Sequence, residues 1–140
     1  MTVRARGLGW NDGLALAALL ALLGMGAWLV SRGMTARAAM ERAAAITGGD
    51  PERGRALARD RGCGGCHVIP GVSRATGLVG PSLERMASRV YIAGVLANNS
   101  GNMVRWLQNP PAVDPLTAMP NLHLERHDAR DIAAYLYTLD

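Results

Sequence analysis

The stretch CGGCH, residues 63–67, contains both cysteines of this 140-residue chain and one of its three histidines. Two cysteines separated by two residues can form a redox dithiol, half of a zinc site, a structural disulfide or the attachment point of a c-type haem. A thioredoxin-like dithiol would need a βαβ context, and a tetrahedral zinc site would need a second pair of Cys or His ligands. Only haem attachment accounts for the histidine that directly follows the second cysteine.

In a C-x-x-C-H motif the two thiols, here those of Cys63 and Cys66, add across the two vinyl groups of haem. The resulting thioethers hold the macrocycle and do not touch the iron, whereas His67 stands beneath the iron as its proximal ligand. The motif therefore predicts one covalently attached haem c, bound by Cys63, Cys66 and His67.

Two amphipathic helices are predicted on either side of this motif. Asp50 is a suitable N-cap for a helix that begins at Pro51 and continues through residues 52–62 into the motif. Two helices of this kind can cross closely where one offers a small residue, and we expect Gly54 to contact Tyr135. The second helix ends the chain, with i, i+3, i+4, i+7 spacing at Ile132, Tyr135, Leu136 and Leu139.

With these features, residues 50–140 resemble a class I cytochrome c domain. In that family a Gly-Pro-x-Leu segment follows the haem motif, and here it is GPSL at residues 80–83. The resemblance implies an all-α fold around one covalently bound haem. It also implies that the Pro81 carbonyl accepts a hydrogen bond from the ring N–H of His67, which orients the imidazole and strengthens it as a ligand.

The second axial ligand must come from a side chain downstream of His67. Met119 is favoured because it lies in DPLTAMPNL, residues 114–122, a proline-flanked stretch without helical or strand period. An extended loop of this kind can lay a thioether across the haem face opposite His67. The resemblance places the axial methionine in the same T-x-M setting and implies that Thr117 hydrogen-bonds a haem propionate. The side chains considered are Met86, Met103, Met119, His123 and His127.

Met103 follows an apolar helix pattern with Trp106 and Leu107, so it is expected in the core, and Met86 is likewise expected to pack rather than to bind the iron. His123 lies four residues after Met119, where relatives commonly carry a small residue. It is expected at the surface, although it could replace Met119 when the loop loosens or at high pH. His127 falls in the first turn of the last helix and is a weaker candidate.

Three further residues are expected near the haem. The resemblance implies that Trp106 packs beside the haem, close to the axial methionine. Arg89 and Arg105 are candidates to pair with the propionates, and a solvated surface position is the alternative for each of them.

Residues 13–30 form an uncharged run of eighteen residues. As a helix that rises ~1.5 Å per residue, this run would be about 27 Å long, close to a hydrocarbon core of ~30 Å. Trp10 and Trp28 would then place one indole near each membrane interface. The competing interpretation is a cleaved signal peptide, since Ala36 and Ala38 make an A-x-A-like site, but a signal h-region usually spans only ~7–15 residues.

The stalk that follows is predicted to be short. It includes a helix-favouring block, Met34–Ile46, which Gly48 and Gly49 would close. If helical, this block reaches only ~20 Å, so the following domain is expected close to the membrane surface. The predicted parts of the chain are a cytoplasmic N-terminus at 1–12, a transmembrane anchor at 13–30, the stalk at 31–49 and a haem domain at 50–140.

The charge distribution argues against one class of partner. Residues 1–49 carry five arginines against two acidic residues, and residues 50–140 carry ten against nine. The basic excess therefore lies around the apolar segment, whose expected partner is membrane lipid, and no face resembles a nucleic-acid-binding surface.

An iron held by His67 and Met119 has no vacant position for oxygen, peroxide or a substrate. The expected chemistry is therefore one-electron transfer, with no catalytic residue and no small-molecule substrate. A neutral thioether raises the reduction potential relative to bis-histidine ligation, which suits a place late in a respiratory chain. The resemblance implies haem attachment outside the bacterial inner membrane, so the domain is expected in the periplasm and the N-terminus in the cytoplasm.

The leading hypothesis is a single-pass, membrane-anchored cytochrome c that relays electrons to or within a membrane respiratory complex. A terminal oxidase is the first choice of partner, and a quinol-oxidising complex would be the donor. The short stalk favours a resident subunit, because a shuttle needs reach. Two alternatives stay open: the electron-accepting subunit of a dehydrogenase, and a haem enzyme or gas sensor in which Met119 dissociates.

Overall fold

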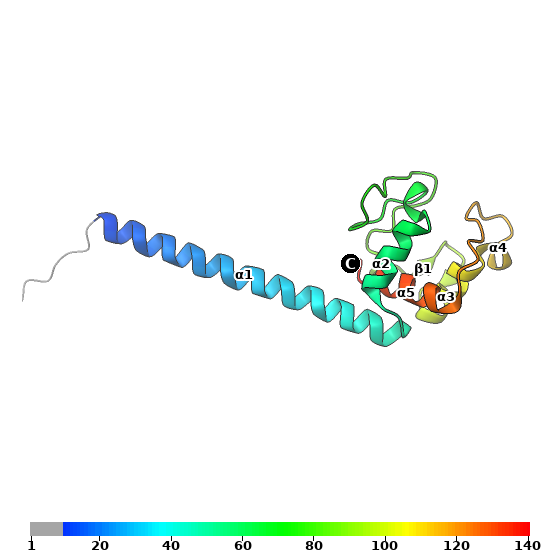
Figure 1. Cartoon of the computed structure of the whole chain (residues 1–140), viewed down its shortest axis with the longest axis horizontal. Coiled ribbons are helices and arrows are strands. Elements are labelled where there is room, and N and C mark those ends of the chain that lie inside the picture. Colours follow the sequence, from blue (N-terminus) through cyan, green and yellow to red (C-terminus); the bar gives the residue numbers. More distant parts are fainter. Residues whose placement is uncertain (1–9) are drawn as a thin grey trace, which may run out of the picture. The chain divides into compact units, whose positions relative to one another are not determined.

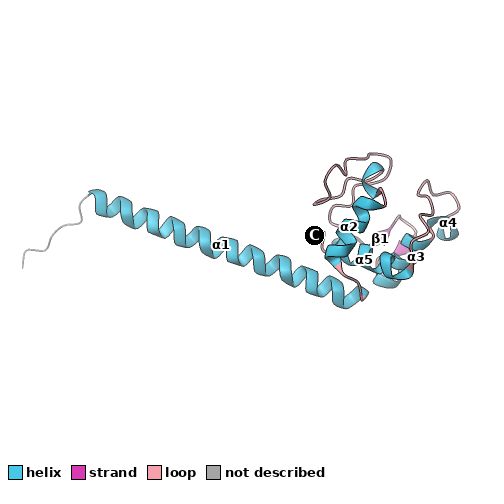
Figure 2. Cartoon of the chain, in the orientation of Figure 1, coloured by secondary structure: helices cyan, strands magenta, loops and turns pink. Residues whose placement is uncertain are grey.

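The sequence predicts an all-α fold, and the described part of the chain is mostly helical. A computed structural model describes residues 10–140, so Arg4, Arg6 and most of the segment 1–12 lie outside the described residues. Figure 2 shows helices joined by long loops, together with a small amount of strand. Within residues 10–140 the elements are α1 (Trp10–Thr47), α2 (Pro51–Asp60), the 3-10 turns η1 (Cys63–Gly65) and η2 (Met86–Ser88), β1 (Tyr91–Ile92), β2 (Leu96–Ala97), α3 (Ser100–Gln108), α4 (Pro110–Val113) and α5 (Arg126–Leu136) (Figure 1).

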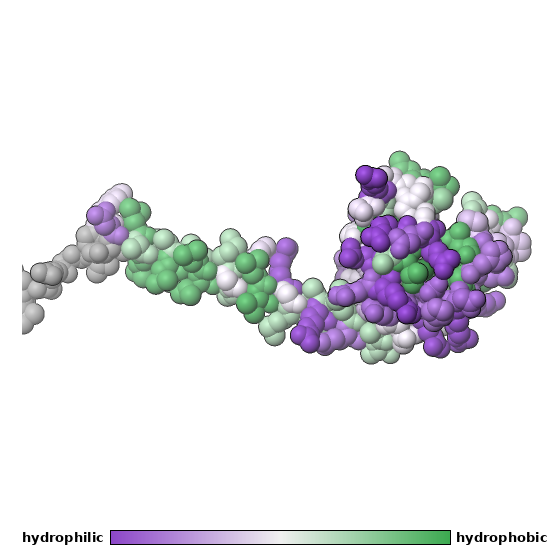
Figure 3. Space-filling model, in the orientation of Figure 1, coloured by the Kyte–Doolittle hydropathy of each residue, from purple (hydrophilic) through white to green (hydrophobic). Residues whose placement is uncertain are grey.

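Helix α1 includes both the expected anchor at 13–30 and the helix-favouring block of the expected stalk. An 18-residue window within Gly13–Thr47 has a mean hydropathy of 2.2, and none of that window is buried. In Figure 3 green, hydrophobic side chains follow this helix, whereas purple, hydrophilic ones cover much of the domain face in view. The helix has the length and composition of a membrane span, and a signal sequence near the N-terminus has the same properties.

The chain divides into two compact units, Met1–Ala36 and Arg37–Asp140, and the last turns of α1 belong to the second. Ala43 and Thr47 are buried there, and the Thr47 hydroxyl donates to the Ala43 carbonyl at 2.7 Å. Gly48, with φ of +68°, closes the helix as predicted. A Cβ on Gly49 would lie 2.7 Å from the backbone nitrogen of Asp131 in α5, so only glycine fits here without displacement.

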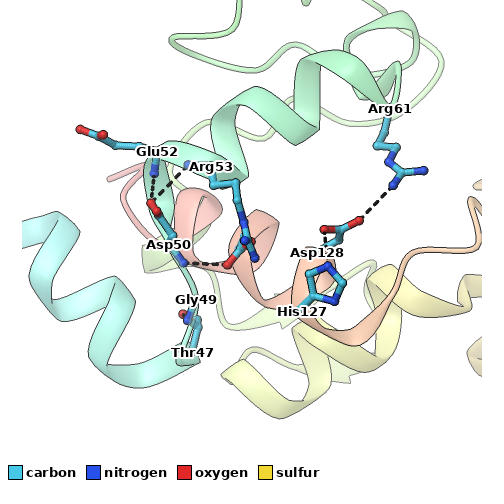
Figure 4. A network of polar contacts seen from close by, with 9 residues as sticks. Thr47, Gly49, Asp50, Glu52, Arg53, Arg61, His127 and Asp128 are labelled. Atoms are coloured by element: carbon cyan, nitrogen blue, oxygen red, sulfur yellow. Dashed lines mark hydrogen bonds and ion pairs between the residues drawn. The ribbon is translucent and has the colours of Figure 1, made fainter.

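Helix α2 begins as predicted, with Asp50 as its N-cap and Pro51 in its first turn. The Asp50 carboxylate accepts from the backbone N–H groups of Glu52 at 2.8 Å and Arg53 at 3.2 Å, as Figure 4 shows. The prediction that the helix continues through residue 62 is wrong, because α2 ends at Asp60. Gly62 adopts a φ of +74°, a left-handed conformation that stops the helix and starts the 3-10 turn η1.

Helices α2 and α5 pack together through Gly54, as predicted, and the atoms nearest to an added Cβ belong to the backbone of Asp131 and Ile132. Gly54 faces the backbone of α5, where an added Cβ would overlap the Asp131 carbonyl and lie 3.0 Å from Ile132 N. The helices therefore approach so closely that backbone meets backbone, which the apolar spacing of the side chains does not indicate.

Buried carboxylates on α5 hold this crossing with polar contacts. Asp131 accepts the backbone N–H of Asp50 at 2.8 Å and pairs with the guanidinium of Arg53. Asp128 pairs with Arg61 at 3.0 Å, so a second ion pair joins the far end of α2 to the first turn of α5 (Figure 4). Because both carboxylates are buried, loss of Arg53 would leave the charge of Asp131 without an ion-pair partner, whereas Asp128 would keep a contact with His127 at 3.1 Å after loss of Arg61.

Tyr135 forms a hydrogen bond and packing contacts of its own. Its hydroxyl donates to the carbonyl of Pro70, and its ring packs in a small cluster with Ala58 and Ile69. Tyr135 therefore ties α5 to the loop that follows the CGGCH motif.

The main core lies between α3 and α5. Met103, Leu107, Ile132 and Leu136 are buried in it, and Met86 joins them from η2. Leu139 was expected on the last helix, but α5 ends at Leu136 and Leu139 packs against the core from beyond the helix end.

The short β-hairpin formed by β1 and β2, with two residues in each strand, was not predicted. Ile92 pairs with Leu96 across a turn in which Ala93 and Gly94 have φ of +51° and +77°. Two consecutive residues with positive φ are typical of the tight turns of β-hairpins. The sequence signal, Ala-Gly, is weak because alanine rarely adopts this conformation.

The C-terminal tail is tied to the segment between η2 and β1. The Tyr137 hydroxyl donates to Asn98 Oδ1 at 2.7 Å, and the Asn98 amide donates to the carbonyls of Met86 at 2.9 Å and Arg89 at 2.8 Å. Substituting Tyr137→Phe is expected to lower the free energy of unfolding by about 1 kcal/mol at neutral pH, the usual net value of a hydrogen bond.

This stabilisation should depend on pH. Burial raises the pKa of Tyr137 to about 12, whereas an unfolded tyrosine titrates near ~10. The contribution of the neutral phenol is therefore complete below about pH 10 and is lost as the pH rises through about 12. Denaturant unfolding of the wild type and the Tyr137→Phe variant at several alkaline pH values should show the difference shrinking, and a constant difference would contradict the assignment.

Candidate haem site

The CGGCH motif forms a tight turn that places both cysteines and the histidine at one cavity. The Cys63 carbonyl accepts the backbone N–H groups of Cys66 at 3.2 Å and His67 at 3.0 Å. The loop at 77–80 lies against this turn, since the N–H of Gly77 bonds the Gly64 carbonyl at 3.0 Å and that of Gly80 bonds the Cys66 carbonyl at 2.8 Å.

The imidazole of His67 is held from two sides. Its Nδ1 lies 2.8 Å from the Pro81 carbonyl oxygen, the contact that the GPSL segment implies. The carbonyl can only accept, so Nδ1 carries the proton and Nε2 stays free to bind a metal. A Cβ on Gly80 would lie 2.6 Å from Nδ1 and 2.9 Å from Nε2 of His67, so glycine is needed where the backbone passes the ring.

The cavity has a volume of about 370 Å³ and a mostly apolar wall. It is lined from α2, α3, α5, both 3-10 turns, the hairpin and two loops. The predicted site residues Cys63, Cys66, His67, Pro81, Trp106, Thr117 and Met119 all line it.

Met119 reaches the cavity from an irregular loop, as expected. Asp114 stands at the start of this loop and accepts two hydrogen bonds. Its carboxylate accepts the N–H of Leu116 at 3.0 Å, and its backbone carbonyl accepts the N–H of Thr117 at 3.1 Å. The Thr117 hydroxyl oxygen then accepts the N–H of Met119 at 3.2 Å. The hydroxyl proton of Thr117 is left available for an acceptor such as a carboxylate in the cavity.

The other candidate ligands separate into two groups. Met86 and Met103 line the cavity but are only 4% and 1% exposed, respectively, so they lie in the core as expected. His123 and His127 are exposed and do not line the cavity. Of the thioethers in the cavity wall, only that of Met119 comes from a loop and is partly exposed.

The two arginine candidates also differ. Arg89 lines the cavity, and its guanidinium donates to the carbonyls of Ser82 and Glu84, the latter at 2.9 Å. Arg105 is exposed on the other side of α3 and does not line the cavity, so pairing of Arg105 with a haem propionate is not supported. Arg105 precedes Trp106 directly, and adjacent residues of a helix point in different directions.

The surroundings of Cys63 favour its neutral thiol form. Burial raises the pKa of Cys63, with a smaller contribution from the neighbouring Cys66. Within residues 10–140 no group of three or more His, Cys, Asp or Glu side chains is placed to hold a metal ion.

The residues present fit a haem. The wall is apolar, as a macrocycle requires, and two thiols, an imidazole with a free Nε2 and a thioether share one cavity. Sequence reasoning missed Ile92 and Ala93, which the unpredicted hairpin brings into the wall. It also missed the packing role of Gly80, for which a glycine directly before the family proline was the only signal.

The two glycines inside CGGCH should respond differently to substitution. A Cβ on Gly64 would lie 2.7 Å from Ala75 Cα and 2.8 Å from Ala75 Cβ, whereas a Cβ on Gly65 would meet nothing within 4 Å. Gly64→Ala is expected to lower the free energy of unfolding of the holoprotein by about 1–3 kcal/mol, and Gly65→Ala to change it by less than about 0.5 kcal/mol. Thermal unfolding followed by haem absorbance measures both, and equal effects would contradict the packing of Ala75 on this turn.

The fold and the site define a helical c-type haem protein suited to electron transfer. Comparison with known families agrees with this class. A family model described as "Cytochrome c" matches residues 51–140, and the chain belongs to the cytochrome c family. Family membership implies covalently bound haem c, and Cys63, Cys66 and His67 form the corresponding C-x-x-C-H motif. The chain is accordingly a cytochrome c electron carrier.

Similar proteins include subunits of an oxidase. The chain is 31% identical over 88 residues to "Cytochrome c oxidase subunit 2" of Alkalihalophilus pseudofirmus. The aligned segment covers 62% of this chain and 25% of that protein. The chain is 28% identical over 88 residues to the protein of the same name from Bacillus subtilis, covering 61% and 25%. The chain thus spans about a quarter of the length of these relatives. The comparison with solved structures finds no significant match.

Proposed function

We propose that this chain is a membrane-anchored monohaem cytochrome c that passes single electrons to or within a terminal oxidase. The observation that carries the proposal is the single cavity in which the CGGCH turn and the Met119 loop meet. When bound there, haem c supplies a reversible one-electron oxidation and reduction.

The roles of the residues follow from their contacts. Cys63 and Cys66 would hold the macrocycle through thioethers, and His67 would bind the iron through its free Nε2 while the Pro81 carbonyl fixes the ring. Met119 would supply a second ligand through its thioether. Thr117 holds the Met119 backbone and has its own proton available for a propionate.

Trp106, which is 7% exposed, lines the cavity and would lie beside the haem. An apolar surround favours the state of lower charge on the iron, so it raises the reduction potential together with the neutral thioether. Bound by both His67 and Met119, the iron would have no coordination site left for a substrate.

The apolar helix α1 supports membrane attachment. Its window of mean hydropathy 2.2 has the composition of a span, and Arg32 lies over the ring of Trp28 at 4.4 Å, a pairing typical of the polar border of a membrane helix. We place the haem domain in the periplasm, because covalent haem attachment takes place outside the inner membrane in this family.

The choice of an oxidase as partner is supported by the relatives. Two proteins named cytochrome c oxidase subunit 2 resemble this chain over 88 residues, in a segment that matches only a quarter of their length. We propose that the present chain supplies its haem domain to a terminal oxidase, with a quinol-oxidising complex as the electron donor.

Native separation of solubilised membranes tests the partner. Membranes are dissolved in a mild detergent, separated under native conditions, stained for haem and analysed by mass spectrometry. Co-migration of the full-length, haem-stained chain with oxidase subunits is expected. Co-migration with a dehydrogenase instead would replace the proposed partner, and a chain cleaved near Ala38 would contradict the membrane anchor.

A further inference from the structure

A second groove lies behind α3, away from the haem cavity. Its volume is about 630 Å³, and it is formed by the end of α1, by α3 and the residue that follows it, and by the first turns of α5. All of its residues belong to the unit Arg37–Asp140. Three of them are arginines: Arg105 on α3, and Arg126 and Arg130 on α5.

Within residues 10–140, none of the three arginines takes part in an ion pair, and no carboxylate lines the groove. The buried acids of α5 are already occupied, since Asp131 pairs with Arg53, and Asp128 with Arg61. Three like charges thus face one hollow without compensation, although residues 50–140 as a whole are nearly neutral.

The groove and the haem cavity use opposite faces of α3. Met103, Trp106 and Leu107 line the cavity, whereas Arg105 and Gln108 line the groove. The two sites share no residue. A molecule bound in the groove would therefore leave the mouth of the haem cavity open.

We infer that this groove is a docking site for an acidic segment of a partner protein. The charges are spread over two helices, with Arg126 and Arg130 one turn apart on α5, so they suit several carboxylates better than one compact anion. Gln108 and Asn109 offer amides that can bond an extended backbone, and Ile46 gives an exposed apolar contact. Charge, hydrogen bonding and apolar contact together favour a peptide chain over a free phosphate.

Docking behind α3 would hold the domain against its partner while electrons pass at the other face. This inference does not depend on the identity of the electron acceptor or on the assignment of Met119. Loss of groove binding with an unchanged haem spectrum would separate it from the electron-transfer role.

Peptide binding to the full-length holoprotein in detergent tests the inference. The probe is fluorescein-labelled hexaglutamate at low ionic strength, followed by fluorescence anisotropy. The variant Arg105→Gln/Arg126→Gln/Arg130→Gln removes the groove charges, and Arg42→Gln/Arg74→Gln/Arg85→Gln removes three exposed charges elsewhere. At typical values for exposed charge pairs, the groove variant should bind roughly tenfold more weakly, and the control should stay within about twofold of the wild type.

Two other results would overturn the inference. Equal weakening in both triple variants would mean that hexaglutamate responds only to net charge. Displacement of the peptide by soluble dihexanoyl phosphatidylglycerol or inorganic phosphate at concentrations far below that of unlabelled hexaglutamate would identify a lipid headgroup or phosphate site. Absorbance spectra of all variants should match, because none of the six arginines lines the haem cavity.

Discussion

Replacing Met119 with alanine is expected to abolish the methionine-to-iron charge-transfer band of the ferric protein and to let carbon monoxide bind the ferrous protein at neutral pH. The reason is that Met119 is the loop thioether in the cavity wall, and under the proposed ligation its removal would take one ligand from the iron. The reduction potential should fall by on the order of 0.1 V, within the span of about 0.8 V that axial ligands control.

Two control variants separate ligation from packing. Met103→Leu changes a buried thioether in the same wall, and His123→Ala removes the exposed imidazole nearest to Met119 in sequence. Both should keep the band and exclude carbon monoxide. If the wild type already binds carbon monoxide at neutral pH, Met119 dissociates and the gas-sensor alternative replaces simple electron transfer.

Gly54→Ala is expected to have the largest effect on folding. An added methyl group would overlap the Asp131 carbonyl and lie 3.0 Å from Ile132 N, so α2 and α5 must move apart. A rotamer change cannot relieve a clash between the added methyl group and the backbone of α5. The free energy of unfolding should therefore fall by about 3 kcal/mol or more, the upper range for overpacking. The midpoint of thermal unfolding should fall by about 10 °C or more in a domain of this size.

The matched control is Gly101→Ala on α3. A Cβ there would lie 3.5 Å from Asn99 Oδ1, an ordinary contact, and alanine in a helix is favoured over glycine by roughly 0.5–1 kcal/mol. Gly101→Ala should therefore be neutral or slightly stabilising. Equal yields and melting temperatures for Gly54→Ala and wild-type holoprotein would show that the helices do not cross at Gly54.

Much of the site could be predicted from the sequence because its chemistry depends on rare residues at fixed spacing. Cys63, Cys66 and His67 stand together, and the T-x-M setting distinguishes Met119 from the methionines with helix periodicity. The start of α2 was equally readable, because an N-cap is a local interaction between Asp50 and the next three residues.

Other features could not be predicted because they depend on contacts between distant segments. The partner of Gly54 is a backbone carbonyl, and side-chain periodicity cannot indicate how deeply two helices approach. The hairpin uses Ala93 at positive φ, against the intrinsic preference of alanine. Arg105 lies outside the cavity because adjacent residues of a helix point in different directions, and it is the neighbouring Trp106 that faces the cavity.

The most direct test of the central claim is an oxygen pulse on membranes that contain the full-length chain, with the haem absorbance followed in time. The membranes are first reduced under anaerobic conditions, and the experiment is repeated with cyanide to block terminal oxidases. Rapid oxidation of this haem that cyanide suppresses is the predicted result, because the electron then leaves through an oxidase. Oxidation that is unaffected by cyanide, or a haem that stays reduced after the pulse, would contradict the assignment of this cytochrome c to an oxidase.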